Sequence, residues 1–386
     1  MTAEIPFNRP CLAGRELDYV KESIAKGHSS AKGPFTVKVQ DLLRQRLGAK
    51  DVLLTTSCTD ALEMSAMLLD LQVGDVVIVP SFTFSSTATA FARQGATLRF
   101  CDIRMPELGL DPDHVEASID ERVKAIVTVH YAGVACEPTR LREIAQRHGI
   151  PLIEDNAHGL FAEHDGVQLG RFGRMSTLSF HETKNFICGE GGALVLNDEA
   201  DIERAHTLLD KGTNRREFLE GQTDKYTWQG HGSSFGISDI LAAFLLAQLE
   251  QASEIMRKRR DAHQNYRALL EPYVERFGFA LPYARPGDVP ADHMFYVLLP
   301  SGTPRHDIIG QMRVAGVNPT FHYVPLHSAP GASKLAEGAS CPVTDDVSAR
   351  LLRLPFFNDI TLEEQTLVVE SFVGALEASR VGFGGK

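Results

Sequence analysis

The chain has 386 residues, of which 43% are hydrophobic and 23% charged, as in ordinary soluble globular proteins. At roughly 100–200 residues per domain, this length allows two or three domains and a large core. The formal net charge of −11 argues against a general nucleic-acid binder, whose affinity rests on neutralising phosphates, but it leaves room for a local basic pocket that takes a small anion.

Signals for membrane insertion, secretion and disulfide bonds are absent from the sequence. No apolar run approaches the roughly 20 residues needed to span a bilayer. Met1–Pro10 lacks the basic start and apolar stretch of a signal peptide. The six cysteines form no C-x-x-C pair and are too few for a disulfide scaffold. We therefore expect a cytoplasmic protein with reduced thiols and no membrane partner.

Short β-branched runs alternate with helical patterns through the first two-thirds of the chain. The runs are apolar on both faces, as in strands that helices cover on both sides. The expected strands are Asp51–Thr56, Val76–Pro80, Leu98–Asp102, Ala125–Tyr131 and Leu152–Asp155, and the helices between them include Thr59–Leu69 and Glu137–His148. This order predicts an α/β fold with a mostly parallel sheet.

The next segment carries two more apolar runs and a helix. Ser176–Phe180 and Ala193–Leu196 are expected strands that bracket a Gly-rich loop at Gly189–Gly192. From Ile237 to Leu249, apolar residues recur with the spacing of one helix face. A polar, charged segment follows this helix and is expected to lead into a second domain.

The last third of the chain predicts a smaller α+β unit. Its expected elements are a strand at His293–Leu299, a helix at Pro304–Val314, a strand at Asn318–Pro325 and a final helix that the capping-box spacing of Thr361 and Glu364 announces. We therefore expect a large α/β domain at residues 1–245 and a smaller α+β domain at residues 246–386.

Two motifs follow expected strands. At Thr55–Leu62 a strand ends, small hydroxyl residues follow, and a helix begins. A helix N-terminus suits a phosphate, although Ser and Thr are also ordinary helix caps. Asp155 ends another strand at the sheet edge where ligands bind in open α/β folds. Its carboxylate could hold a cationic nitrogen or could be a solvated loop acid.

A third motif places Lys184 directly after a buried strand, in a Gly-rich turn. A desolvated lysine has a lowered pKa and can form a Schiff base with an aldehyde, whereas most lysines lie at the surface. His181-Glu182 does not continue to H-E-x-x-H, so we expect no metal site here. The glycines at 189, 191 and 192 do not form the G-x-G-x-x-G pattern of nicotinamide enzymes.

The three motifs together are more specific than each alone. A phosphate cradle, an acid at a strand end and a lysine 29 residues later (184 − 155) are the three anchors that pyridoxal phosphate requires. The amine binds the aldehyde, the helix N-terminus binds the phosphate, and the carboxylate keeps the pyridine nitrogen protonated, so that the ring can take up electrons.

The motifs also resemble those of the DegT/DnrJ/StrS family of fold-type-I, pyridoxal-phosphate-dependent nucleotide-sugar aminotransferases. The matching segments are Thr56–Thr59, Pro80–Phe84, Glu154–His158, Gly170–Gly173 and Ser179–Asn185, and the resemblance runs from about Pro6 to about Val373. It implies an aspartate-aminotransferase-like fold, with a mostly parallel seven-stranded sheet in the large domain.

The resemblance also implies roles for individual residues. Lys184 would be the Schiff-base lysine, Asp155 would pair with the pyridine nitrogen, His158 would lie beside the ring hydroxyl, and Phe84 would stack on the ring. Cys58, Thr59 and Ser179 would hold the phosphate. Ser234 stands where the family has an Asn from the neighbouring subunit. The resemblance therefore implies a homodimer with shared active sites.

Three further segments, Asp210–Arg216, Asp224–Trp228 and Phe321–His327, most resemble family members that aminate TDP-4-keto-6-deoxy-D-glucose at C-4 with L-glutamate as donor. The residues implied to bind the nucleotide sugar are Lys211, Arg215, Tyr226, Tyr323 and His327. The positive charges suit a diphosphate, although they also fit an exposed basic loop, and Tyr323 also fits a packed strand.

Other functions remain open at this stage. The sugar could be aminated at C-3, or another nucleotide sugar could be used. Sugar dehydratases that resemble this family carry His at the lysine position, so Lys184 argues against them. A non-enzymatic regulator is disfavoured because no DNA-binding helix pair or basic appendage is evident.

Overall fold

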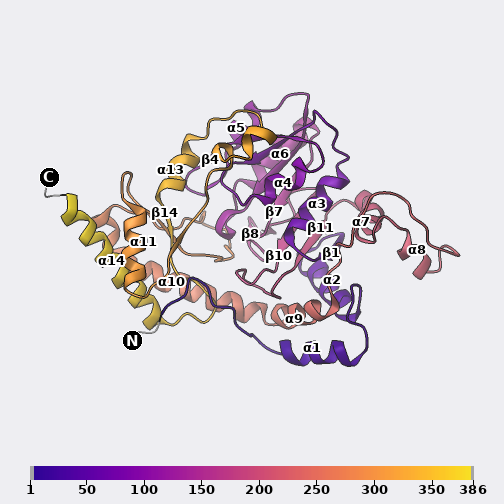
Figure 1. Ribbon diagram of the computed structural model, residues 1–386, viewed down its shortest axis with the longest axis horizontal. Coiled ribbons are helices and arrows are strands. Elements are labelled where there is room, and N and C mark those ends of the chain that lie inside the picture. The colour runs from indigo at the N-terminus through magenta and orange to yellow at the C-terminus, as the bar shows by residue number, and fades with distance from the viewer. Residues whose placement is uncertain (1–3, 384–386) are drawn as a thin grey trace.

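The main sheet is built from seven strands, in the order β1-β11-β10-β7-β6-β2-β3. Figure 1 shows four of them, β1, β11, β10 and β7, in the middle of the molecule. The computed structural model describes residues 4–383. The strands are β1 (Asp51–Thr55), β2 (Val76–Pro80), β3 (Thr97–Cys101), β6 (Val123–Val129), β7 (Leu152–Asp155), β10 (Met175–Ser179) and β11 (Gly192–Leu196). Only β11 runs antiparallel to its two neighbours. The expected α/β fold with a mostly parallel sheet is confirmed.

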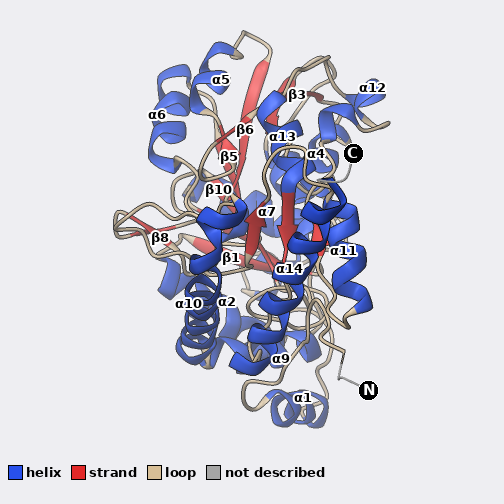
Figure 2. Cartoon of the chain, turned by 90° about the vertical axis from the view of Figure 1, so that its left-hand side faces the viewer, coloured by secondary structure: helices blue, strands red, loops and turns tan. Residues whose placement is uncertain are grey.

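Helices cover both faces of this sheet, and this is why the strands read as continuous apolar runs (Figure 2). Side chains alternate between the faces, so Leu53 and Val77 pack with α3 (Cys58–Leu68), α4 (Ser86–Ala92) and α7 (Ile202–Leu209). Val52 packs on the other face with α2 (Pro34–Leu47) and α9 (Asp239–Glu250). Ile78 packs there with α5 (Pro112–Ala117) and α6 (Pro138–His148).

A second, three-stranded antiparallel sheet has the order β12-β14-β13, with β12 at Tyr296–Leu298, β13 at Thr320–Phe321 and β14 at Leu351–Arg353. Its own apolar core includes Tyr266, Phe295 and Phe372 and is formed with α10 (Ala252–Phe277), α11 (Arg305–Val314) and α14 (Leu362–Phe383). The division into domains at 1–245 and 246–386 stays a prediction.

Three strands differ from the expected ranges where the chain turns toward a cavity. β6 ends at Val129, because a 3-10 turn at Tyr131–Gly133 contains Ala132 with φ of 58°. β12 and β13 are shorter than expected, because His293, His322 and Tyr323 leave the ladders and line the cavity described below.

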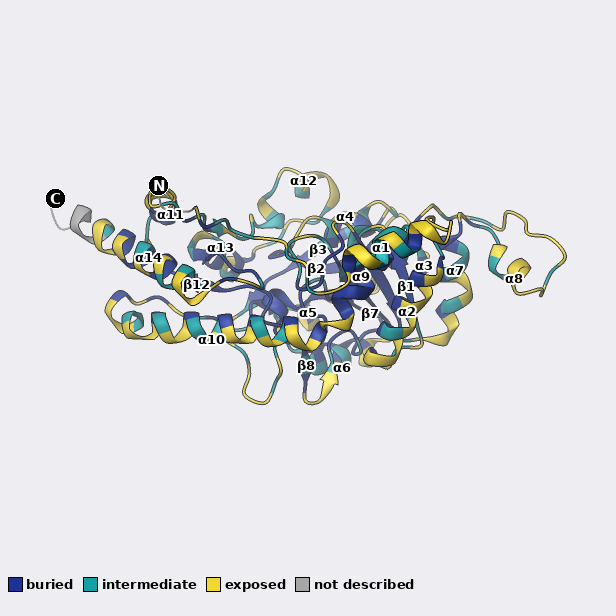
Figure 3. Ribbon diagram, turned by 90° about the horizontal axis from the view of Figure 1, so that it is seen from below, coloured by how far each residue is buried: buried dark blue, intermediate teal, exposed yellow. Residues whose placement is uncertain are grey.

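The remaining elements are α1 (Glu16–Ala25), α8 (Arg215–Leu219), α12 (Ala332–Leu335), α13 (Pro342–Arg350), the hairpin of β4 (Ile103–Arg104) and β5 (Gly109–Leu110), and that of β8 (Glu163–His164) and β9 (Val167–Gln168). Helix α8 belongs to an arm, residues 211–234, that extends from the end of the molecule opposite α14 (Figure 3). Antiparallel bridges at Asp210–Ser234 and Thr213–Trp228 close the arm into a loop.

The capping box before α14 is confirmed. The Thr361 N–H donates to Glu364 Oε2 at 2.9 Å, and the Glu364 N–H donates to Thr361 Oγ1 at 3.1 Å. The described part of the chain contains no helix that is both long and apolar enough to cross a bilayer. All six cysteines are free thiols.

Candidate active site

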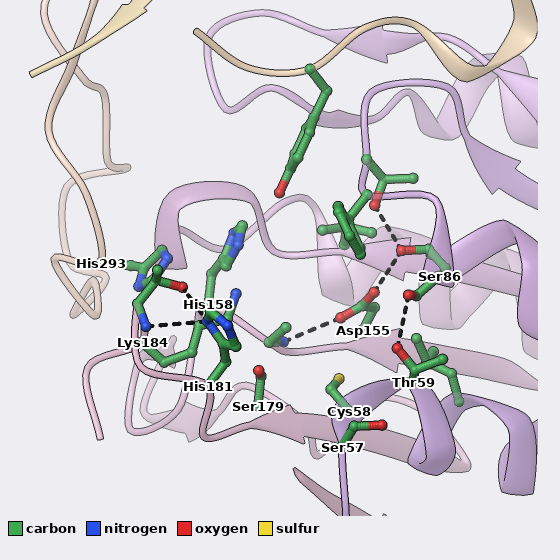
Figure 4. A pocket seen from close by; sticks show the side chains of 18 of the residues that line it. Ser57, Cys58, Thr59, Ser86, Asp155, His158, Ser179, His181, Lys184 and His293 are labelled. Carbon is green, nitrogen blue, oxygen red and sulfur yellow. Dashed lines mark hydrogen bonds between the residues drawn. The ribbon is translucent and has the colours of Figure 1, made fainter. Parts of the chain in front are cut away.

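The carboxyl ends of β1, β7 and β10 open into one cavity of about 490 Å³ (Figure 4). Because these strands point the same way, residues far apart in the sequence meet at this edge. Of the residues predicted for the site, the cavity is lined by Cys58, Thr59, Phe84, Asp155, His158, Ser179, Lys184 and Tyr323.

The N-terminus of α3 forms one wall and can bind an anion. Ser57 caps the helix, since its hydroxyl accepts the Asp60 N–H at 3.1 Å. The Thr59 hydroxyl lies 2.8 Å from that of Ser86, and both line the cavity with Ser179 (Figure 4). First-turn N–H groups and the helix dipole favour a phosphate in this position.

Glycine at 192 allows this wall to form. A Cβ on Gly192 would lie 2.3–2.4 Å from the backbone of Ser57 and Cys58, so only glycine lets β11 pass directly beneath the start of α3. The close packing holds the helix N-terminus against the sheet edge that carries Ser179.

Asp155 ends β7, and two donors hold its carboxylate. The Thr87 hydroxyl, itself 2.8 Å from the Thr83 hydroxyl, donates to Oδ2 at 2.7 Å, and the Ala157 N–H donates to Oδ1 at 3.3 Å. Burial raises the pKa of this carboxyl, while the Thr87 bond and the positive charge of Lys184 oppose the rise. The carboxylate is therefore fixed in orientation and buried, so a cationic partner is favourable.

The preceding residue, Glu154, faces away from Asp155 and is structural. Its carboxylate accepts the N–H groups of Gly170, Phe172 and Gly173 at 2.6–2.8 Å. The same carboxylate is bonded to His130 Nε2 at 2.9 Å. These bonds explain the Gly170–Gly173 turn before β10.

Lys184 follows β10 in a turn where its N–H donates to the His181 carbonyl at 2.9 Å. Burial lowers the pKa of its ammonium group from 10.5 to about 8, and the nearby charge of Arg353 adds to this effect, while the negative charge of Asp155 opposes it. The side chain is therefore a half-buried, desolvated amine that exchanges its proton near neutral pH. The sequence-based alternative of an exposed surface lysine does not fit this position.

His158 and His293 form a neutral stacked pair in the cavity. Their ring centroids lie 4.3 Å apart with planes at 16°, and burial holds both pKa values well below the usual range. Asn185 fixes His293 by a bond of 2.8 Å to its Nδ1. The Nδ1 atom of His158 is buried and has no hydrogen-bond partner among the described residues. It is available to a polar group inside the cavity.

Phe84, 61% exposed, lies at the cavity with a ring face free to stack on a planar ligand. Arg353, His322, His293 and Phe7 also line the cavity, and the sequence analysis did not single them out. The sequence contains one indication for Arg353, because a charged residue within the apolar segment Leu351–Leu354 is unusual.

Five predicted residues lie elsewhere. The residues outside the cavity of this chain are Lys211, Arg215, Tyr226, Ser234 and His327. The first four are in the exposed arm. The side chain of His327 is 8% exposed, and its Nδ1 lies 2.6 Å from the Ser81 hydroxyl, so it joins the end of β2 to the segment after β13. Their binding roles stay predictions.

An amine, an acid and an anion cradle around one cavity are the features of a pyridoxal-phosphate enzyme. The described residues fit that cofactor. The helix N-terminus can accommodate the phosphate, His158 lines the cavity and has a buried Nδ1 without a partner among the described residues, and the desolvated Asp155 is suited to a protonated nitrogen.

Comparison with known proteins agrees with this class. A model of the DegT/DnrJ/EryC1/StrS aminotransferase family matches residues 10–373. An uncharacterized protein of Methanocaldococcus jannaschii is 30% identical over 380 residues, which cover 95% of this chain and 96% of that protein. The chain therefore belongs to the DegT/DnrJ/EryC1/StrS aminotransferase family, whose members depend on pyridoxal 5′-phosphate.

Two solved structures share the fold along nearly their whole length. The aminotransferase TlmJ from Streptoalloteichus hindustanus is 27% identical with a TM-score of 0.89, over 97% of this chain and 99% of that one. PseC of Helicobacter pylori, an aminotransferase involved in the biosynthesis of pseudoaminic acid, is 24% identical with a TM-score of 0.89, over 97% of this chain and 100% of that one.

The lowered pKa of Lys184 predicts how its reactivity depends on pH. We expect the cofactor-free protein to capture pyridoxal phosphate covalently at a rate that rises with pH through a midpoint near 8, because the neutral amine is the nucleophile. Borohydride trapping followed by peptide mass spectrometry measures the rate at Lys184. In Asp155→Asn the midpoint should fall, since the anion that favours the ammonium form is gone. A midpoint near 10.5 would contradict a desolvated amine.

The bond from Thr87 to Asp155 predicts a cofactor-binding defect in Thr87→Val. This change keeps the shape but removes a donor to a buried carboxylate, so we expect pyridoxal phosphate to bind about 10- to 100-fold more weakly. Absorbance titration gives the dissociation constant. Thr89→Val is the matched control, because that hydroxyl lies on the same helix but bonds only to the Ser85 carbonyl at 3.0 Å. Equal affinities of the two variants would rule out the role of Thr87.

Proposed function

We propose that the protein transfers the amino group of L-glutamate to a nucleotide-linked keto-deoxysugar, with TDP-4-keto-6-deoxy-D-glucose as substrate and TDP-4-amino-4,6-dideoxy-D-galactose as product. The observation that carries the proposal is the meeting of Lys184, Asp155 and the α3 N-terminus in one cavity of an aminotransferase. The choice of sugar rests on the motifs at 210–216, 224–228 and 321–327.

In this proposal each residue of the cavity has its own role in the reaction. When bound, pyridoxal phosphate supplies an aldehyde and an electron-withdrawing ring. The Nζ atom of Lys184 binds the aldehyde and, when released, moves the proton between substrate carbon and cofactor, for which a pKa of about 8 is well matched. Asp155 holds the positive charge on the ring nitrogen. His158 would bind the ring hydroxyl, and Phe84 would stack on the ring.

The amino donor and the sugar react one after the other in this cavity. His158 and His293 line it and are neutral, so they add no positive charge that would lower the pKa of Lys184 further. Buried side chains around the cavity exclude water from the reacting atoms, which strengthens the interactions of Asp155.

We also propose a homodimer in which the arm of one copy completes the cavity of the other. The arm carries Lys211, Arg215 and Tyr226 but does not reach the cavity of its own chain. Its Trp228 is 81% exposed and its Tyr226 52%, so it presents apolar surface together with positive charge. Both properties suit a partner subunit and a nucleotide diphosphate.

The free thiols support a cytoplasmic location.

The substrate assignment predicts one product. Incubation of the cofactor-loaded enzyme with TDP-4-keto-6-deoxy-D-glucose and L-glutamate should give a sugar with an axial amine at C-4, identified by NMR. Lys184→Ala should be inactive because it lacks the amine that binds the cofactor and moves the proton. No amine at C-4, together with amination of a 3-keto sugar or of another nucleotide-linked keto-sugar supplied in parallel, would keep the aminotransferase and reject this substrate.

The shared site predicts complementation between two inactive variants. Lys184→Ala fails in the cavity, and the double variant Lys211→Ala/Arg215→Ala fails in the arm. In a symmetric dimer with shared sites, subunits mixed 1:1 should regain about a quarter of wild-type activity, since half of the dimers are mixed and each has one intact site. No recovery would show that each chain builds its own site. Size-exclusion chromatography confirms that the subunits exchange.

A further inference from the structure

Arg353 is a buried arginine that lines the cavity and has no acidic partner within residues 4–383. It is 9% exposed, and burial lowers the pKa of its guanidinium group. The groups that oppose this effect are the hydroxyls of Tyr131 and Tyr323, not carboxylates. A buried cation without a counter-charge is unfavourable, so an anion in the cavity would relieve a real electrostatic penalty.

The guanidinium group is held in one orientation. Its Nη1 donates to His322 Nε2 at 2.6 Å, and its carbon lies 4.5 Å from the centre of the Phe7 ring. Burial and the charge of Arg353 hold the pKa of His322 far below the usual range, so this ring is neutral. Since Nε2 accepts a bond, Nδ1 carries the hydrogen and donates to the Tyr131 hydroxyl oxygen at 3.2 Å.

Part of the Arg353 guanidinium group makes no hydrogen bond to the described residues. The Nε atom of Arg353 is buried and has no partner among the described residues. Buried Arg259 differs, since its nitrogens donate to the carbonyls of Asp292 and His293 and to Asn358. A planar guanidinium group with free N–H donors matches a carboxylate, which it can bind through two parallel bonds.

Neither acid that lines the cavity forms an ion pair with Arg353. Asp155 is bonded to Thr87 and Ala157, and Glu190 lies 3.6 Å from His181 in the Gly-rich turn. Arg353 comes from the second sheet, whereas the anion cradle at α3 belongs to the main sheet. The cavity thus has two separate places for anions, and its amine, Lys184, is close enough to Arg353 to be affected by its charge.

The geometry points to Arg353 as the residue that binds a carboxylate of the amino donor, with His322 and Tyr131 as positioning residues that orient its guanidinium group. The inference rests on the proposed aminotransferase reaction with an amino-acid donor, and it does not depend on which sugar is aminated.

The two half-reactions test this assignment. In single turnovers of the cofactor-loaded enzyme, followed by the cofactor's visible absorbance, Arg353→Met should raise the apparent dissociation constant of L-glutamate about 10- to 100-fold, as expected for lost bonds to a charged group. The reaction with the amino-sugar product, which carries no carboxylate at its amine, should change less than about 2-fold. Arg353→Lys keeps the charge but cannot form two parallel hydrogen bonds, so its dissociation constant for L-glutamate should lie between those of wild type and Arg353→Met.

Arg305→Met is the matched control. Arg305 is also buried, has an unpaired Nε and lies 4.9 Å from the centre of the Phe321 ring, but it is outside the cavity. Its replacement should leave the L-glutamate dissociation constant unchanged. Glutarate provides a readout without turnover, since it should raise the melting temperature of the cofactor-free wild type and of Arg305→Met, but not that of Arg353→Met.

The outcomes separate this inference from the proposed sugar. If the sugar assignment fails but Arg353→Met still loses L-glutamate and glutarate selectively, the carboxylate site stands. Unchanged binding of both probes to Arg353→Met would overturn it. A defect confined to the sugar half-reaction would also overturn it and would assign Arg353 to the nucleotide diphosphate. Equal defects in both half-reactions, in Arg353→Lys as well, would show a structural role only.

Discussion

The site depends on placing one carboxylate and one amine at the same sheet edge with little water between them. Burial alone would neutralise both groups, since it raises the pKa of Asp155 and lowers that of Lys184. Their mutual attraction and the Thr87 bond act in the opposite direction. The parallel strands β7 and β10 bring the two groups to the same edge of the sheet, because Asp155 pairs with Thr177 near the end of β10 and the turn that carries Lys184 follows. The chemistry of the cavity is therefore a direct consequence of strand direction.

Much of the main sheet could be predicted because its strands are covered on both faces. Apolar runs of 4–7 residues gave the seven strands, with β6 displaced by two residues. Asp155, Lys184 and the start of α3 could be predicted as site residues, since Asp155 ends β7 and the other two lie within five residues of the end of a strand. Local sequence was sufficient there because the strand end itself sets the position.

The far side of the cavity could not be predicted in the same way. Arg353, His322, His293 and Phe7 reach it through packing of the second sheet and the N-terminal segment, and no local periodicity encodes that packing. The strand expected at Asn318–Pro325 is short for the same reason, since His322 and Tyr323 are used in the cavity rather than in the ladder. His327 was selected by motif alone, and its bond to Ser81 was not foreseeable from sequence.

The acid at 154 has a consequence for its neighbour. A one-residue slip of β7 would exchange the faces of Glu154 and Asp155, and would put the wrong acid in front of the amine. Glu154 prevents this slip, because its carboxylate would lose its bonds to His130 and to the three backbone N–H groups that hold it in the present alignment. Two adjacent acids thus have separate positions: Glu154 fixes the alignment of the strand, and Asp155 lines the cavity.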